Sequence, residues 1–118
     1  MRRRLRLHPD GWDRHLDWCA RPATDPEDVR LVREVLIALA VDGWPPAEKD
    51  DEGRSVPRWP YFEDPSSPRH CVVAPAEHLW VVIRLPEAGE EYFDLVTVHY
   101  PTEPEKAASP WLQPWFSP

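Results

Sequence analysis

Two segments in the first third of the chain show the apolar spacing of amphipathic helices. The first runs from Pro9 to the break at Arg21-Pro22, and the second covers residues 26–41. The second has an N-cap candidate in Asp25 and a glycine at position 43 that suits a helix C-terminus. The predicted buried stripes are Trp12, Leu16 and Cys19 in the first helix, and Val29, Val32, Leu36 and Leu39 with Val35 in the second.

From His70 onward the pattern changes to the alternation that is typical of β-strands. Strands are predicted over residues 70–74, 79–85 and 92–100, and the short turns between them make neighbouring strands antiparallel. A further short strand is predicted over residues 3–7, where leucines alternate with arginines. The expected fold is therefore α+β in the order β-α-α-β-β-β, with two N-terminal helices packed on one face of a small antiparallel sheet.

The last hairpin allows a prediction of which sheet face stays open. A turn centred near Ala88–Gly89 sets Trp80 opposite Thr97 and His78 opposite His99. The face that receives the helices then holds Leu79, Val81, Ile83, Leu85, Val96 and Val98. The open face holds His78, Trp80, Val82, Arg84, Phe93, Leu95, Thr97 and His99. A slip of one residue would exchange the two faces.

A long loop and a tail complete a single domain that is expected to cover residues 1–104. The loop, residues 44–69, carries six prolines, although its aromatic residues Trp59, Tyr61 and Phe62 are expected to pack on the body. Residues 105–118 form a tail rich in proline and tryptophan, which is predicted to be neither helix nor central strand. Its apolar residues are expected to dock on the body or on a partner: Trp111, Leu112, Trp115 and Phe116.

Composition narrows the class of protein. A chain of 118 residues with 42% hydrophobic content suits one modest core. It contains two cysteines and no apolar run long enough to span a bilayer, which favours a cytoplasmic protein without membrane contact. The histidines and cysteines lack the spacing of zinc ligands, and no glycine-rich phosphate loop occurs, so no metal or cofactor is expected. Seven tryptophans exceed what such a core can enclose, so some should line a surface or groove.

The charge is unevenly distributed. The net charge is −7, and residues 41–118 alone hold six basic against fourteen acidic residues, or −8. This balance argues against broad, sequence-independent binding of nucleic acid by the second half of the chain.

Three residues of the predicted open face suit RNA cleavage. His99 and His78 are candidates for acid and base catalysis on the 2′-hydroxyl and the leaving group, and Arg84 is a candidate to hold the phosphate. Trp80 is a candidate for stacking a base. Arg54, Arg58 and Arg69, interleaved with aromatic residues, are further candidates for RNA contact. The alternatives are that both histidines are merely solvated and that these three arginines pair with nearby carboxylates.

The opening segment Arg4-Leu5-Arg6-Leu7-His8-Pro9 precedes a helix, and Leu95-Val96-Thr97-Val98-His99-Tyr100 forms the predicted closing strand. In this order of elements, over roughly residues 3–100, the chain resembles the RelE/ParE toxin superfamily. The resemblance implies a bacterial toxin that pairs with a cognate antitoxin. If the chain is an enzyme, the resemblance implies a metal-independent ribonuclease. Two features depart from the family: the chain is acidic, and His99-Tyr100-Pro101 stands where members often carry an arginine.

A second function class fits the same sequence. An acidic, non-enzymatic interaction protein, such as an immunity or antitoxin-like protein, could mask a basic toxin by electrostatic complementarity. The net charge, the acidic second half and the tail rich in tryptophan favour this alternative.

Overall fold

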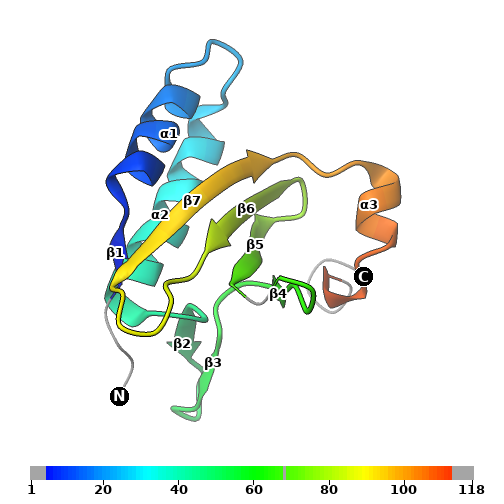
Figure 1. Ribbon diagram of the computed structural model, residues 1–118. Coiled ribbons are helices and arrows are strands. Elements are labelled where there is room, and N and C mark those ends of the chain that lie inside the picture. Colours follow the sequence, from blue (N-terminus) through cyan, green and yellow to red (C-terminus); the bar gives the residue numbers. More distant parts are fainter. Residues whose placement is uncertain (1–4, 68, 113–118) are drawn as a thin grey trace.

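The computed structural model describes residues 5–67 and 69–112 (Figure 1). The chain forms a mixed α+β fold, which confirms the predicted class. The strands are β1 (Arg6–Leu7), β2 (Ala47–Lys49), β3 (Ser55–Pro57), β4 (Tyr61–Glu63), β5 (His70–Ala76), β6 (Leu79–Arg84) and β7 (Tyr92–His99). The helices are α1 (Pro9–Cys19), α2 (Pro26–Asp42), α3 (Glu103–Ala107) and the 3-10 turn η1 (Pro110–Leu112).

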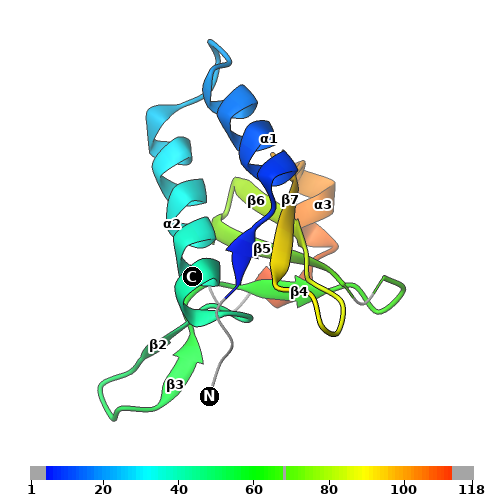
Figure 2. The same ribbon diagram turned by 60° about the vertical axis from the view of Figure 1, so that its left-hand side comes forward.

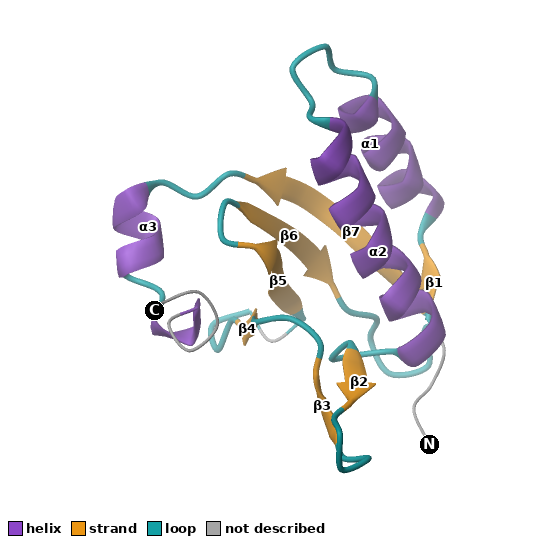
Figure 3. Ribbon diagram, turned by 180° about the vertical axis from the view of Figure 1, so that it is seen from behind, coloured by secondary structure: helices purple, strands orange, loops and turns teal. Residues whose placement is uncertain are grey.

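The main sheet has five strands in the order β1-β7-β6-β5-β4. The meander of β5, β6 and β7 is antiparallel as predicted, but β1 lies parallel to β7 at one edge. At the other edge β4 pairs with β5, although its residues were expected to form a loop. The sheet is therefore larger than predicted and is not purely antiparallel. Figure 3 shows α1 and α2 on the same side of this sheet.

Helix α2 contributes more residues to the hydrophobic core than α1 does. Its N-cap Asp25 accepts a hydrogen bond from the Glu27 backbone N–H at 2.8 Å, and Gly43 ends the helix with a φ of 77°. Both caps were predicted. The residues of α2 in the core are Val32, Val35, Leu36 and Leu39, which pack with Cys71, Val73, Leu79, Val81, Ile83, Phe93 and Leu95 of the sheet.

Helix α1 turns a different face to the core than its apolar pattern predicts. The buried residues are Gly11, His15 and Trp18, whereas Trp12 and Leu16 are 46% and 43% exposed. The reason is the close approach of α1 to β7 at Gly11. A Cβ atom at this position would lie 2.8 Å from the backbone nitrogen of Leu95. The helix is therefore rotated so that its smallest residue faces the sheet. Of the predicted stripe, Trp12 and Leu16 point outward, whereas Cys19 is packed against the core.

Strand β7 contains a β-bulge that corrects the predicted register. Val82 pairs with Thr97 but Ile83 pairs with Leu95, so Val96 is the extra residue. Phe93 and Leu95 consequently face the core, 0% and 1% exposed, while Val96 is 39% exposed. The prediction was wrong for these residues and right for Leu79, Val81 and Ile83, which are fully buried. At the far end of the hairpin Trp80 pairs with His99 instead of Thr97.

The regions predicted to be irregular contain short regular elements. Strands β2 and β3 form a separate hairpin that projects from the body (Figure 2), and Gly53 in its turn has a φ of 77°. In the tail, α3 begins with a capping box between Thr102 and Glu105, and Pro104 lies in its first turn, where proline is tolerated. The prediction of a tail without helix was therefore wrong for this segment. None of the helices in the described part of the chain has the length and apolar character needed to cross a bilayer.

The fully buried His15 predicts a pH dependence of stability. Burial, and then the positive charge of Arg33, lower the pKa of His15 below 6.5. Arg33 Nε donates to His15 Nε2 at 3.2 Å, and Cys19 Sγ lies 3.5 Å from the same atom. His15 therefore binds a proton near pH 6.5 in the unfolded chain, but only at a lower pH in the folded chain. The contribution of neutral His15 to the free energy of unfolding is fully present above this pH, and it is lost as the pH falls through the lowered pKa.

The measurement compares the urea midpoints of the wild type and His15→Gln between about pH 8 and about pH 5.5. Glutamine does not titrate, and its carbonyl oxygen can still accept from Arg33. We expect the wild type to lose more stability than the variant over this range. Parallel pH profiles for the two proteins would show that His15 does not contribute.

Candidate functional site

A groove lies between the open face of the sheet and the C-terminal segment of α3 and η1. It has a volume of about 430 Å³, and its walls are mostly apolar. The residues that line it are Phe62, Val72, Trp80, Ala108, Ser109, Pro110 and Trp111. Three aromatic side chains meet in this groove: Phe62, Trp80 and Trp111.

The alternation of the strands presents one wall of this groove. Phe62 of β4 pairs with Val72 of β5, and both point away from the core because Tyr61 and Val73 point toward it. On β6, Trp80 lies between Leu79 and Val81, which are fully buried, and therefore faces the same open side. Three neighbouring strands thus place apolar side chains on a face that α1 and α2 do not cover.

The opposite wall is held by the turn between α3 and η1. Ser109 is buried and its Oγ donates to the backbone oxygen of Glu105 at 2.8 Å, while Leu112 is also buried. These contacts set Trp111 over the sheet. Its ring lies 5.5 Å from that of Trp80 and 6.0 Å from that of Phe62, stacked on the latter. The apolar residues Trp111 and Leu112 therefore dock on the body of the protein, and the predicted docking residues Trp115 and Phe116 lie outside the described residues.

One polar group of the groove has no partner. The Nε1 atom of Trp80 is buried and makes no hydrogen bond in the described chain. A buried, unpaired donor costs about 1–3 kcal/mol, because it loses water and gains nothing in return. An indole N–H can only donate.

His99 closes one end of the open face. Its ring lies 5.8 Å from that of Trp80, and its Nε2 atom is 2.7 Å from Oε2 of Glu105. Glu105 also accepts from the backbone N–H of Thr102, and these contacts lower the pKa of its carboxyl group. The His99–Glu105 contact ties strand β7 to α3 and so fixes the segment that carries Trp111.

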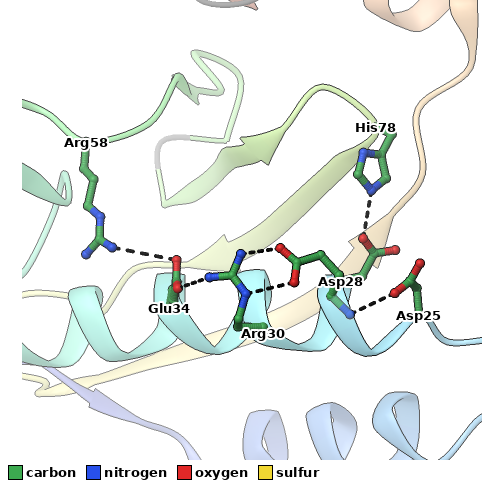
Figure 4. A network of polar contacts seen from close by, with 7 residues as sticks. Asp25, Asp28, Arg30, Glu34, Arg58 and His78 are labelled. Carbon is green, nitrogen blue, oxygen red and sulfur yellow. Dashed lines mark hydrogen bonds and ion pairs between the residues drawn. The ribbon is translucent and has the colours of Figure 1, made fainter.

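The predicted catalytic residues are only partly brought together. His99 and Trp80 are neighbours, and Arg84 lies on the same strand as Trp80, with no side-chain partner among the described residues. His78 lies instead in the turn between β5 and β6, and its Nε2 atom is 2.8 Å from Oδ1 of Asp28 on α2. Figure 4 shows this side chain reaching to the helix. His78 is thus held on the side of the sheet that α2 covers.

Asp28 was not predicted as a polar centre. Its carboxylate is buried in the first turn of α2 and also accepts a hydrogen bond from the Tyr100 hydroxyl at 3.1 Å. Burial and the neighbouring Asp28 raise the pKa of Tyr100. Acidic residues are common in the first turn of a helix, because the helix dipole favours them there. The sequence therefore contains no sign that Asp28 has partners far away in the chain.

The three arginines predicted to contact RNA make ion pairs, but only Arg54 pairs with a carboxylate close by in the same loop. Arg54 pairs with Asp50 at 3.0 Å inside the β2–β3 hairpin, and Arg69 pairs with Glu87 at 2.8 Å. Arg58 lies 3.7 Å from Glu34 (Figure 4), and its guanidinium is 4.4 Å from the centre of the Trp59 ring. These residues belong to three different segments and do not line the groove.

Comparison with known proteins finds no matching family model, no similar curated protein and no similar solved structure. The resemblance to the RelE/ParE superfamily therefore stays a prediction, and the function has to be argued from the groove and its surroundings.

Proposed function

We propose that the chain is a non-enzymatic interaction protein that holds an apolar segment of a basic partner protein in the groove of Phe62, Trp80 and Trp111. The observation that carries this proposal is the open groove in which the rings of Phe62, Trp80 and Trp111 meet. Aromatic side chains in a concave, largely dry site are typical anchors of protein recognition.

Charge supports a basic partner. Residues 41–118, which form the groove, carry a net charge of −8. Asp64 follows Phe62 by two residues in the chain, and hydrogen bonds from Ser66 lower the pKa of its carboxyl group. A net negative charge steers a positively charged protein toward the chain and disfavours nucleic acid.

The alternative of a ribonuclease toxin stays a prediction. It needs an acid, a base and a phosphate-binding cation around one phosphate. His99 and Arg84 are on the open face, but His78 is bound to Asp28 at the other side of the sheet. His70 of β5 pairs with Arg84 and alternates with the buried Cys71, so it lies on the open face as well, with its Nδ1 atom 2.7 Å from Ser67 Oγ. A ribonuclease at this face would have to use His99 and His70 in place of His78.

The test is a capture experiment with matched variants. The tagged full-length protein is expressed in its own host, and the bound proteins are compared for the wild type, Trp111→Ala and Trp12→Ala. Trp12 is an exposed tryptophan of α1 and does not line the groove. We expect a protein of positive net charge to be retained by the wild type and by Trp12→Ala, to be lost with Trp111→Ala, and to dissociate as the salt concentration rises.

Two results would contradict the proposal. One is that the wild type and Trp111→Ala retain the same proteins in equal amounts. The other is that what the groove retains is RNA, which would favour the ribonuclease alternative. Circular dichroism of each variant shows whether it is folded before the comparison is made.

A further inference from the structure

We propose that the outer face of α1 and α2 is the interface of a two-fold dimer, in which the helix pair of one copy packs on the helix pair of a second copy. This face belongs to the helix side of the sheet, whereas the groove belongs to the open side. The interface is therefore separate from the groove and does not rest on the proposed function.

Four large apolar side chains lie uncovered on this face. Trp12 and Leu16 are four residues apart on α1 and are nearly half exposed, while Ile37 and Val41 have the same spacing on α2 and are 63% and 56% exposed. Residues at this spacing lie one above the other along a helix. These four are half of the eight large hydrophobic residues exposed in the described chain, and they include the two most exposed. Such a concentration of apolar surface is typical of a protein–protein interface.

The two rows form one patch because the helices lie side by side. Arg33 Nε lies 3.2 Å from His15 Nε2, which sets these two residues at the same level of the antiparallel helix pair (Figures 2 and 3). Trp12 lies about one turn from His15, and Ile37 lies about one turn from Arg33 in the same direction. Trp12 and Ile37 are therefore at the same level on adjacent helices, with the other residue of each row at the two ends of the patch.

A two-fold axis parallel to the helices would bury this patch against itself. The rotation sets α1 of one copy over α2 of the other at the same level, so that Trp12 of each copy packs against the partner's Ile37. Each of the four helices is then antiparallel to both of its neighbours, which is the arrangement of an up-and-down four-helix bundle. An interface of this kind closes at two copies and covers the apolar rows of both.

Charges beside the patch favour a second copy over a different protein. Asp13 of α1 and Arg33 of α2 are both exposed, and neither makes an ion pair among residues 5–67 and 69–112. Asp13 lies two residues before His15, so it is about 3 Å from the level of Arg33 along the helix axis. The two-fold rotation brings Asp13 of each copy over α2 of the other, close to the partner's Arg33. The chain thus carries both halves of an ion pair that the dimer forms twice.

Sedimentation equilibrium of the purified full-length chain tests for the dimer. The measurement runs from about 1 μM to about 500 μM protein in about 0.15 M salt, which screens the net charge of −7 on each copy. We expect the mass to rise with concentration toward twice 13.8 kDa, with a Kd below about 100 μM. Ile37→Glu introduces a charge at the centre of the patch and should raise the Kd at least about tenfold. Val96→Glu introduces the same charge at an exposed apolar position of β7 and should leave the Kd unchanged.

A charge exchange tests how the two copies are arranged. Asp13→Lys would face the partner's Arg33, and Arg33→Glu would face the partner's Asp13, so each variant alone should have a Kd raised about fivefold or more. In an equal mixture of the two variants, both pairs of the heterodimer join opposite charges, so the dimer should return. Recovery on mixing also shows that both variants are folded, which matters because Arg33→Glu loses the hydrogen bond to His15.

The outcomes are distinct. A wild type that stays monomeric over the whole range overturns the proposal, and this includes the case in which a different protein covers the face. An unchanged Kd for Ile37→Glu overturns it as well, because the dimer would then use another face. Failure of the charge variants to recover on mixing overturns the two-fold arrangement. Loss of the dimer with Ile37→Glu, its retention with Val96→Glu and its recovery in the mixture support the proposal. Trp111→Ala should dimerise like the wild type, so the capture experiment on the groove succeeds or fails independently.

Discussion

Phe93→Ala is expected to destabilise the protein by about 3–5 kcal/mol, whereas Val96→Ala changes its stability by no more than about 0.5 kcal/mol. Phe93 is completely buried in β7, and its truncation leaves a cavity among the core side chains of α2, β5 and β6. Val96 is the extra residue of the bulge and is 39% exposed. The pair is informative because a strand without a bulge would reverse the two costs.

Chemical unfolding in urea measures both variants under the same conditions. Thr97→Ala, at an exposed neighbouring position, gives the cost of a substitution in this strand without loss of core packing. A larger loss for Val96→Ala than for Phe93→Ala would show that β7 has the register expected from simple alternation. A similar loss for both would show that neither face is the core.

Gly11→Ala should destabilise the protein by about 1–3 kcal/mol. In an exposed helix the same change stabilises by about 0.5–1 kcal/mol, because alanine has the higher helix propensity. The sign is reversed here because the new Cβ would lie 2.5 Å from Asp94 Oδ1 and 2.8 Å from Leu95 N. The helix has to move away from β7, which also weakens the hydrogen bond from Arg14 Nε to the Leu95 oxygen, now 2.7 Å long.

A second substitution shows which contact is responsible. Asp94→Ala removes the side-chain clash but leaves the backbone of Leu95 in place. We therefore expect the double variant Gly11→Ala/Asp94→Ala to remain less stable than Asp94→Ala alone. If Gly11→Ala has no effect, or raises the thermal midpoint, then α1 does not approach the sheet as closely as the structure indicates.

The sequence predicted most accurately the elements in which local signals and burial agree. Helix α2 has its caps at Asp25 and Gly43, and Val32, Val35, Leu36 and Leu39 of its predicted stripe are buried. In α1 the two kinds of signal conflict, since its buried stripe contains a glycine and a histidine. Hydrophobicity alone cannot identify such a face, because the fit of Gly11 against β7 depends on a strand far away in the chain.

The groove could be predicted in part. Alternation along β6 correctly placed Trp80 on the open face, and the surplus of tryptophans correctly indicated that some would line a surface. Phe62 and Trp111 come from a segment expected to be a loop and from the tail. Their meeting with Trp80 depends on β4 joining the sheet and on the capping of α3, and neither leaves a periodic signal in so few residues.

The bulge in β7 also bears on how the length of this chain can vary. A one-residue deletion in a strand normally exchanges the core and solvent faces on one side of the deletion. Val96 is already surplus to the pairing, since Leu95 and Thr97 face consecutive residues of β6. Its removal would leave Phe93, Leu95 and Val98 on the core side. Strand β7 can therefore lose a residue at this position without an exchange of its core and solvent faces.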